Sequence, residues 1–394
     1  MKILYVTDVF PPHCGGSGWS VYFFARGLRR RGHEVRIVTL DGLPREYDGF
    51  RVEALPLTRP RAPFLANWTR QRDLPRIASE LRAAGADVDL AHAHHKLSAI
   101  ALSKAQPARY FVTIRDYWPV CVCGRSVYRT GALCSRGDFT RCSRHDSLWK
   151  GLAAPFAYSW FEARMRERLE QMQHAQRIFC ISHYVRQQLV PFFEPQKLDV
   201  LPNFAEEIAA PAPQDLPERY LLYVGRLEEN KGPQLLPQIL QDSGVRLPLV
   251  VVGEGSLGQP LEEECARRGL DVRLFGYREY PEMLQILSRC ESVLFPSRWA
   301  EPLGRVLIES AMMGKAVVAF SHPGGHLDIV EQERTGLLAD TPESFAGAVA
   351  RLVSDEGLRR RLGSEARARY ERLFSPEVVL PRLIQAYQQT AGAF

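Results

Sequence analysis

The sequence predicts an α/β protein built from two Rossmann-like domains that face a cleft. Apolar runs of strand length alternate with stretches of helical length from residue 2 onwards, an order that favours parallel, doubly wound sheets. A proline-rich, acidic segment at 203–217 interrupts this alternation, which then begins again. At 394 residues the chain is long enough for two hydrophobic cores. We therefore expect one domain at 1–200 and a second at 201–375.

In the first domain, each expected strand is a short apolar run bounded by turn residues, and each expected helix is a longer stretch. The cations Arg29, Arg30 and Arg31 followed by Gly32 are typical of a helix C-terminus. The expected strands are 2–7, 34–39, 51–56, 89–93, 110–113 and 177–181, and the expected helices are 20–31, 72–84, 98–105 and 163–174.

The same rules predict the second domain, where Pro302 and Gly304 suit the start of a helix. The final part of the chain, 342–393, is expected to be helical throughout. The expected strands are 220–224, 249–252, 272–275, 292–295, 316–320 and 336–338, and the expected helices are 234–241, 261–268, 282–288 and 304–313.

Composition and charge are those of an ordinary globular protein. Hydrophobic residues make up 45% and charged residues 24% of the chain. The formal net charge of +6 is too small to indicate nucleic acid as a partner. Basic residues mixed with aromatic ones at 51–72 are typical of contact with an anionic membrane surface or a lipid phosphate.

The hydropathy pattern predicts neither a signal peptide nor a membrane span. Met1 and Lys2 lead directly into a strand, and no apolar run approaches the roughly 20 residues that cross a bilayer. We therefore expect a cytoplasmic protein, with peripheral contact to the inner face of the cell membrane.

Four of the eight cysteines lie close together in a loop rich in glycine and arginine. Four thiolates can hold a structural zinc ion, although their spacing is not that of a standard zinc finger. A disulfide or free thiols in a long loop is the competing interpretation. The four are Cys121, Cys123, Cys134 and Cys142.

Two carboxylates flank the turn after the expected strand 292–295. Glu301 falls in the loop at the carboxyl end of that strand, where open α/β sheets bind ligands. Glu309 falls about one and a half turns into the next helix, whose free amide groups can hold an anion. The pair therefore predicts a nucleotide site in which Glu309 contacts the ribose hydroxyls. The alternative is that the two glutamates simply lie on a solvated helix face.

Other strand ends of the second domain carry glycine or charge. Arg226 and Lys231 flank a loop at the same sheet edge and can neutralise a diphosphate. Gly253-Glu254-Gly255 forms a tight turn there, and Gly276-Tyr277 ends a third strand, placed to receive a nucleobase. In the first domain, Gly15-Gly16 follows the first strand and allows a phosphate or sugar to approach the backbone.

These motifs together resemble those of the family-4 retaining glycosyltransferases of the two-domain GT-B fold, over nearly the whole chain. The best matches are Gly15-Gly16, 224–232, 253–255, 275–276, 301–309 and 314–318, and weaker ones are Ser182, Asn203, 324–330 and Gly336-Leu337. The resemblance implies that 1–200 binds the acceptor, that 201–375 binds a UDP- or GDP-sugar, and that a helix at 376–394 packs back on the first domain.

The resemblance also implies roles for single residues. Arg226 and Lys231 contact the diphosphate in place of a metal ion, Glu301 the donor sugar and Glu309 the ribose. No cofactor is required, and configuration is retained because the leaving phosphate takes the acceptor proton on the same face. The other donor contacts are Gly15, Gly16, Gly225, Gly253, Glu254, Tyr277, Leu303 and Gly304.

One position departs from the family pattern. Arg115 stands where the family usually has a histidine after the strand that ends near Thr113. Arg115 can donate to the donor sugar, pair with a carboxylate on a substrate, or mark an impaired site. The neighbouring Asp116 and His94 are implied to line the acceptor side, with a structural role as the alternative for the histidines.

The expected function is transfer of a sugar from a nucleoside diphosphate to a glycan or lipid-linked saccharide. Bacterial cell-surface polysaccharide biosynthesis is the usual setting of such proteins. The alternatives are a sugar-nucleotide epimerase of the same fold and a non-catalytic nucleotide-sugar-binding partner.

Overall fold

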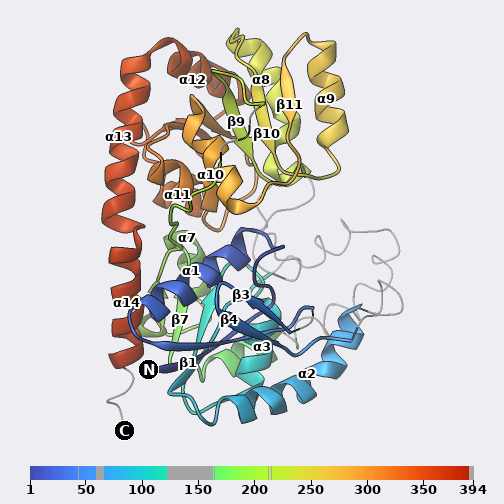
Figure 1. Cartoon of the computed structure of the whole chain (residues 1–394), viewed down its shortest axis with the longest axis vertical. Coiled ribbons are helices and arrows are strands. Elements are labelled where there is room, and N and C mark those ends of the chain that lie inside the picture. The colour runs from blue at the N-terminus through green and yellow to red at the C-terminus, as the bar shows by residue number, and fades with distance from the viewer. Residues whose placement is uncertain are drawn as a thin grey trace. The chain divides into compact units, whose positions relative to one another are not determined.

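The computed structural model divides into two compact units, which are described separately (Figure 1). Unit 1 comprises Met1–Pro202 and Val379–Phe394, and unit 2 comprises Asn203–Val378. The structure describes residues 1–42, 44–58, 66–121, 163, 165–211, 213 and 215–389, and in 66–71 the backbone alone.

Unit 1 is built on an eight-stranded sheet in the order β3-β4-β2-β1-β5-β6-β7-β8. All recorded neighbours are parallel except β3 and β4, which form an antiparallel hairpin at one edge. The strands are β1 Lys2–Thr7, β2 Glu34–Thr39, β3 Arg45–Tyr47, β4 Phe50–Ala54, β5 Leu90–Ala93, β6 Tyr110–Ile114, β7 Arg177–Cys180 and β8 Leu198–Val200.

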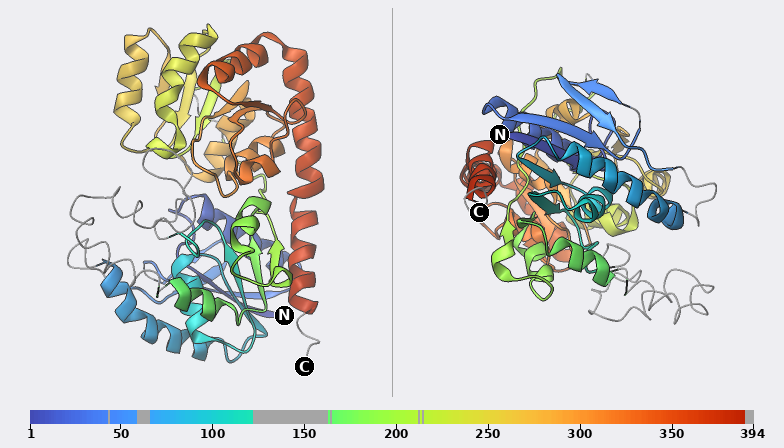
Figure 2. Two further views of the ribbon diagram at one scale, coloured as in Figure 1. Left: turned by 180° about the vertical axis from the view of Figure 1, so that it is seen from behind. Right: turned by 90° about the horizontal axis from the view of Figure 1, so that it is seen from below.

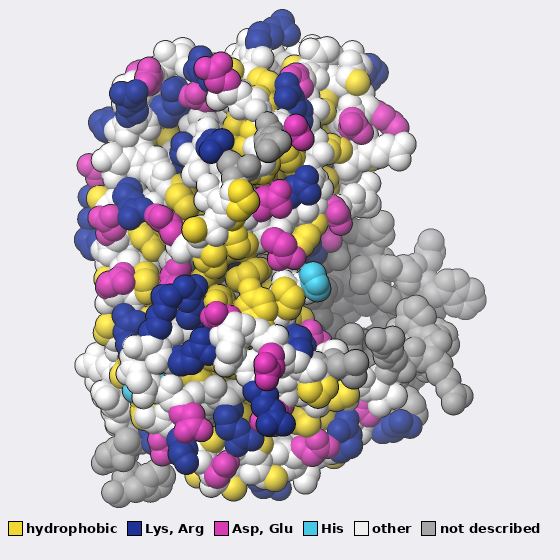
Figure 3. Space-filling model, in the orientation of Figure 1, with side chains coloured by type: hydrophobic (Ala, Val, Ile, Leu, Met, Phe, Trp, Pro, Cys, Tyr) yellow, Lys and Arg dark blue, Asp and Glu magenta, His cyan; other side chains and the backbone are white. Residues whose placement is uncertain are grey.

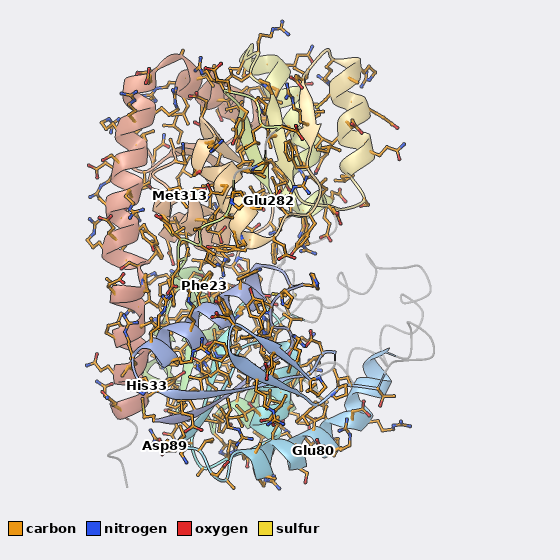
Figure 4. All side chains as sticks on the ribbon, viewed as in Figure 1. Phe23, His33, Glu80, Asp89, Glu282 and Met313 are labelled. Atoms are coloured by element: carbon orange, nitrogen blue, oxygen red, sulfur yellow. The ribbon has the colours of Figure 1, made fainter. Side chains whose placement is uncertain are left out.

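Helices of unit 1 bury the apolar faces of this sheet. Phe23 of α1 is fully buried (Figure 4), and α2 packs beside α3 (Figure 2). The helices are α1 Gly16–Arg30, α2 Ala66–Ala84, α3 Lys96–Ala105, α7 His183–Leu189 and α14 Pro376–Gln389, with a 3-10 turn at Pro195–Lys197.

The C-terminal helix α14 belongs to unit 1 through buried polar and apolar contacts. The Tyr387 hydroxyl lies 2.5 Å from Nδ1 of His92 on β5 and 3.3 Å from the Tyr5 hydroxyl on β1. A Cβ on Gly27 of α1 would lie 2.3 Å from Cδ1 of Leu380 on α14. The lack of a side chain at Gly27 therefore allows the two helices to pack closely. The end of the chain thus completes the core of the first unit.

Unit 2 has a six-stranded parallel sheet in the order β11-β10-β9-β12-β13-β14. The strands are β9 Leu221–Val224, β10 Leu249–Val252, β11 Val272–Leu274, β12 Ser292–Phe295, β13 Val317–Phe320 and β14 Leu337–Ala339. The helices are α8 Leu236–Ser243, α9 Gly258–Arg267, α10 Tyr280–Arg289, α11 Arg305–Met312, α12 Pro342–Ser354 and α13 Glu356–Leu373, with 3-10 turns at Glu229–Lys231, Pro233–Leu235 and Gly325–Asp328.

The predicted α/β class with two parallel Rossmann-like sheets is confirmed. The short elements β3, β8 and α7 were not predicted, because three to seven residues give little periodicity. The region expected to be helical throughout, 342–393, consists of α12, α13 and α14 as far as it is described, and Asp355 separates the first two: it ends α12, and its side chain accepts a hydrogen bond from Leu358 N to begin α13. None of the helices that the structure describes is long and apolar enough to cross a membrane.

Candidate functional site

Three neighbouring strands of unit 2 end in glycine turns that are tied together through the main chain. Gly225 N donates to Val252 O at 3.0 Å, and Gly253 N donates to Gly276 O at 2.8 Å. Gly253 has a φ of +136°, and a Cβ there would lie 2.0 Å from Gly225 O. Only glycine permits this approach. The turns after β9, β10 and β11 therefore form one edge of exposed main chain.

The side chains at this edge are ordered around Glu254. Its Oε1 accepts a hydrogen bond from Tyr277 N at 3.2 Å. The Tyr277 side chain is 44% exposed, unusual for a large aromatic residue. The predicted group of Gly225, Gly253, Glu254 and Tyr277 is thus brought together, with one aromatic face open to solvent.

A buried ion pair joins the loops after β9 and β12. Lys231 Nζ donates to Glu301 Oε1 at 2.6 Å, and the Ser297 hydroxyl donates to the same oxygen at 2.8 Å. The Glu301 side chain is 4% exposed and that of Lys231 is 19% exposed. A charge-assisted hydrogen bond of this length in a buried place fixes both groups.

An aromatic ring completes the surroundings of Lys231. Its Nζ lies 4.8 Å from the centroid of the Trp299 ring, within the range of a cation–π contact. The sequence prediction named Lys231 and Glu301 but missed Ser297 and Trp299. The segment Ser297–Glu301 follows β12 directly, and its two polar or aromatic side chains beside Glu301 were the signal that could have found them.

A glycine explains why residues so far apart in sequence meet. Gly232 has a φ of +74°, and a Cβ on it would lie 1.9 Å from Pro296 O. Beside it, Arg298 N donates to Asn230 O at 3.1 Å. This close passage of two main chains sets Lys231 opposite Glu301.

The backbone of Glu301 is held from a second side by the loop after β13. Gly325 N donates to Glu301 O at 2.6 Å, and a Cβ on Gly324 would lie 3.0 Å from Glu301 N. His326 is 1% exposed and its Nε2 lies 2.9 Å from Phe320 O. Burial, with a smaller contribution from His322, lowers the pKa of His326 to about 4. His326 is therefore a neutral structural residue behind Glu301.

Gly304 begins the helix that carries Glu309. It has a φ of +83° and is the N-cap of α11, while the preceding Leu303 is buried. The Glu309 side chain is 4% exposed, and its Oε1 accepts a hydrogen bond from Arg305 Nε at 2.6 Å. Burial raises the pKa of Glu309 and the Arg305 guanidinium opposes that rise. The solvated helix face is therefore wrong for Glu309.

Sequence reasoning missed Arg305. Its spacing of four residues from Glu309 on a helix was the available signal, because such residues are neighbours on one helix face. The guanidinium carbon of Arg305 lies 4.9 Å from the centroid of the Tyr280 ring on α10.

Arg226 lies on the same loop as Lys231 but has a different partner. Its Nη1 is 2.8 Å from Glu228 Oε1, and its side chain is 61% exposed. The Tyr223 hydroxyl donates to Arg226 O at 2.9 Å, which holds the backbone. Arg226 is thus a solvent-facing cation at the edge of the site.

In unit 1, Arg115 and His94 form one buried group. Arg115 Nε donates to His94 O at 2.8 Å, and its Nη2 lies 3.3 Å from His94 Nδ1. Arg115 is 9% and His94 1% exposed. Because the guanidinium can only donate, His94 Nδ1 accepts and the ring proton lies on Nε2.

The histidines around Arg115 are neutral. Burial lowers the pKa of His92, His94 and His95 well below the usual value, and the charge of Arg115 acts in the same direction. The rings of His92 and His94 lie 4.1 Å apart between centroids. A protonated imidazole would meet both desolvation and a fixed cation there.

The remaining unit 1 residues occupy two loops. Asp116 Oδ1 accepts a hydrogen bond from Trp118 N at 2.7 Å, and burial raises the pKa of Asp116. Gly15 is the N-cap of α1, which begins at Gly16. A Cβ on Gly15 would meet no atom within 4 Å, so the surroundings of this turn are open.

Three of the four cysteines predicted to hold a zinc ion lie outside the described residues. Cys121 is buried, whereas Cys123, Cys134 and Cys142 lie in a part of the chain that is not described. Within the described ranges, no group of three or more His, Cys, Asp and Glu side chains is arranged to hold a metal ion. The structural zinc stays a prediction. The side chains of 59–71, in the basic, aromatic segment, are not described either, so membrane contact by this segment also stays a prediction.

Two family models match the chain. Residues 14–206 match the model described as Glycosyltransferase Family 4, and residues 204–369 match the model described as Glycosyl transferases group 1. The second match contains every unit 2 residue of the candidate site.

Two of the curated relatives described below match over nearly full length, and a third matches less than half of the chain. An uncharacterized glycosyltransferase of Methanocaldococcus jannaschii is 24% identical over 98% of each chain. The glycogen synthase of Mycobacterium tuberculosis is 26% identical over 98% of this chain and 94% of its own. A Campylobacter jejuni N-acetylgalactosaminyltransferase, named for an undecaprenol-linked acceptor, is 30% identical over 44% of this chain and 49% of its own.

Solved structures share the fold. Sucrose-phosphate synthase of Thermosynechococcus elongatus superposes with a TM-score of 0.75 at 20% identity, covering 100% of both chains. Anabaena HepE in complex with UDP and glucose superposes with a TM-score of 0.71 at 18% identity, covering 99% of this chain and 100% of its own.

The close packing of the glycine turns after β9 and β10 can be tested by substitution. We expect Gly253→Ala to lower the free energy of unfolding by more than about 2 kcal/mol, because it forces a Cβ against Gly225 O at a positive φ. Gly347→Ala is the control. Gly347 is exposed inside α12 with no atom near its Cβ, so alanine should stabilise by about 0.5–1 kcal/mol. Urea unfolding measures both, and equal effects would contradict the assignment.

The neutral histidines predict a dependence of stability on pH. The pKa values of His92, His94 and His95 are lowered on folding, so the unfolded chain binds more protons below about pH 6.5. The free energy of unfolding should therefore fall as pH drops through this value, and His94→Gln should make the fall shallower. Exposed His174→Asn is the control. Urea unfolding at a series of pH values measures it, and a constant free energy down to about pH 5 would overturn the prediction.

Proposed function

The chain belongs to the group 1, family 4 glycosyltransferases of the GT-B fold, and from this premise we propose that it transfers a sugar from a nucleoside diphosphate to a saccharide or lipid-linked acceptor, with retention of configuration. The observation that carries this proposal is the Lys231–Glu301 pair, held by Ser297 at the carboxyl edge of the unit 2 sheet. Ligands bind at that edge in open α/β sheets.

In the proposed reaction, the acceptor hydroxyl oxygen forms a bond to the anomeric carbon while the bond from that carbon to the diphosphate oxygen breaks. The acceptor proton passes to the leaving phosphate on the same face. Lys231 and Arg226 stabilise the negative charge that develops on the diphosphate. Glu301 accepts hydrogen bonds from donor sugar hydroxyls. No metal ion or other cofactor takes part.

The remaining donor contacts come from the glycine turns after β9, β10 and β11 and from α11. The free amide groups near Leu303 and Gly304 face the phosphates at the helix N-terminus. Glu309 accepts the ribose hydroxyls. Tyr277 and the turns at Gly225 and Gly253 receive the base, which is uracil or guanine. The neighbour solved with UDP makes uridine nucleotides the first donors to test.

Unit 1 supplies the acceptor side in this proposal. Arg115 takes the place of the family histidine, and with His94 and Asp116 it lines the acceptor pocket. The open surroundings of the Gly15-Gly16 turn leave room for a donor phosphate or an acceptor to approach the backbone.

We place the protein in the cytoplasm, at the inner face of the membrane, in polysaccharide biosynthesis. Lys and Arg side chains gather over the end of α1 (Figure 3). Arg29 of α1 pairs with Asp48 at 3.3 Å and covers Phe50, so it serves the fold, whereas Arg30 and Arg31 are exposed. Exposed cations there favour an acceptor with a lipid phosphate.

Nucleotide binding tests the donor site. In a thermal-shift panel of UDP, GDP, ADP and their sugar conjugates, we expect one base to raise the melting temperature, because a ligand that binds the folded state stabilises it. The rise should shrink in Glu309→Ala, which loses the ribose contact. Glu282→Ala on α10 is a surface control. No rise with any nucleotide would contradict the donor site.

Turnover separates the transferase from its alternatives. We expect Lys231→Ala to lower kcat by about 100-fold or more, since it removes charge stabilisation of the leaving diphosphate. Arg273→Ala, an exposed residue paired with Asp271, should retain activity. Transfer from the matching sugar nucleotide to lipid extract acceptors is measured, with the anomeric configuration of the product. Tight binding without turnover would favour a non-catalytic partner, and conversion of the sugar nucleotide itself an epimerase.

A further inference from the structure

Arg305 stands at a place where a cation is unfavourable. It is the first residue of α11, whose N-terminal end carries the partial positive charge of the helix dipole. Its side chain is only 11% exposed, so water screens that repulsion poorly. The first turn of α11 contains no acidic residue. A guanidinium is retained here because of a specific contact.

That contact is made to Glu309. Arg305 Nε donates to Glu309 Oε1 at 2.6 Å, and the Tyr280 ring on α10 lies against the guanidinium at 4.9 Å. The ring restricts the rotation of a long side chain, so the direction of the N–H is fixed. Among the described residues, the recorded hydrogen bond to the Glu309 carboxylate goes to Oε1.

We propose that Arg305 is a positioning residue for nucleotide binding: it holds Oε1 of the Glu309 carboxylate and thereby presents Oε2 to the hydroxyls of the ribose. The inference rests on the proposed function, in which Glu309 contacts the ribose. A carboxylate held at one oxygen can accept hydrogen bonds from the neighbouring 2′ and 3′ hydroxyls at the other. A free buried carboxyl would take up a proton and offer a donor where the ribose needs an acceptor.

The groups around Glu309 support this role. Burial raises the pKa of Glu309, and Arg305 is the cation that opposes it. From α10, Tyr280 faces the pair, and burial followed by the charge of Glu309 raises the pKa of its hydroxyl. From α13, Arg367 reaches the other end of α11 at Met312 O, and Tyr370 lies beside Arg367. Loss of Arg305 therefore leaves the buried carboxylate beside the neutral Tyr280 hydroxyl without a close cation.

The test compares binding of UDP and 2′-deoxyuridine diphosphate to the full chain by calorimetry. Wild type should prefer UDP, with an affinity that changes little between about pH 7 and about pH 9. Arg305→Met should bind UDP at least about tenfold more weakly at about pH 7, and should recover as pH rises and Glu309 ionises. Its preference for UDP over the deoxy compound should vanish at the lower pH.

Matched controls separate positioning from folding. Arg76→Met removes a helical Arg–Glu pair of the same spacing on α2, Arg76–Glu80 at 2.7 Å, and should leave UDP binding unchanged; Glu80 is labelled in Figure 4. Arg305→Lys keeps a cation and should bind UDP without a pH dependence, which keeps the test decisive where the methionine variant folds poorly. In a Glu309→Gln background, Arg305→Met should have no further effect on UDP affinity.

The outcomes are distinguishable. Wild-type affinity in Arg305→Met at every pH overturns the inference and leaves the proposed function intact. A loss of affinity that is the same at every pH, with the preference for UDP retained, also overturns it, because a merely structural role predicts that result. Absence of UDP binding by wild type, with GDP and its deoxy analogue equally inactive, overturns the proposed function and this inference with it.

Discussion

The passage of the main chain at Gly232 against the carbonyl of Pro296 is the constraint on which the candidate site depends. A side chain at residue 232 would separate the loops after β9 and β12, because its Cβ would lie 1.9 Å from Pro296 O. With glycine there, Lys231 reaches Glu301 at 2.6 Å and Ser297 joins the same oxygen. Gly253 likewise allows the turns after β9 and β10 to approach each other closely, since a Cβ there would lie 2.0 Å from Gly225 O. The polar groups are thus placed by backbone geometry, and the side chains themselves supply the chemistry.

Glu301 and Glu309 are both buried, and each has a close cation. Desolvation costs several kcal/mol per ion, so a buried pair contributes little to net stability. Glu301 meets Lys231 and Glu309 meets Arg305, each through a 2.6 Å contact to Oε1. The two ion pairs instead orient the carboxylates, because a buried ionised carboxylate with one fixed oxygen presents the other oxygen in a known direction. Rigid, desolvated groups of this kind suit the binding of a polyhydroxylated, charged ligand.

The sequence predicted the sheets well and the site in part. Strand ends with glycine or charge indicated the loops that carry Lys231, Glu301 and Glu254, since parallel strands end at one edge. Ser297, Trp299 and Arg305 were missed because their roles come from distances across loops and from burial, which residue types alone do not specify. Asp355, which separates α12 from α13, has a detectable capping signal that the helical pattern on both sides concealed. The ligand-binding roles of all these residues, in both units, stay predictions.

Arg115, at the position where the sequence resemblance implies a histidine, does more than make one hydrogen bond. The guanidinium is permanently charged and buried, and it keeps His92, His94 and His95 neutral by adding its charge to their desolvation. It also fixes the tautomer of His94 by donating to Nδ1. A histidine at 115 would do neither, because it would be neutral at such burial and could accept as well as donate. Arg115 and the three histidines therefore form a buried group whose charge state is constant through the physiological range.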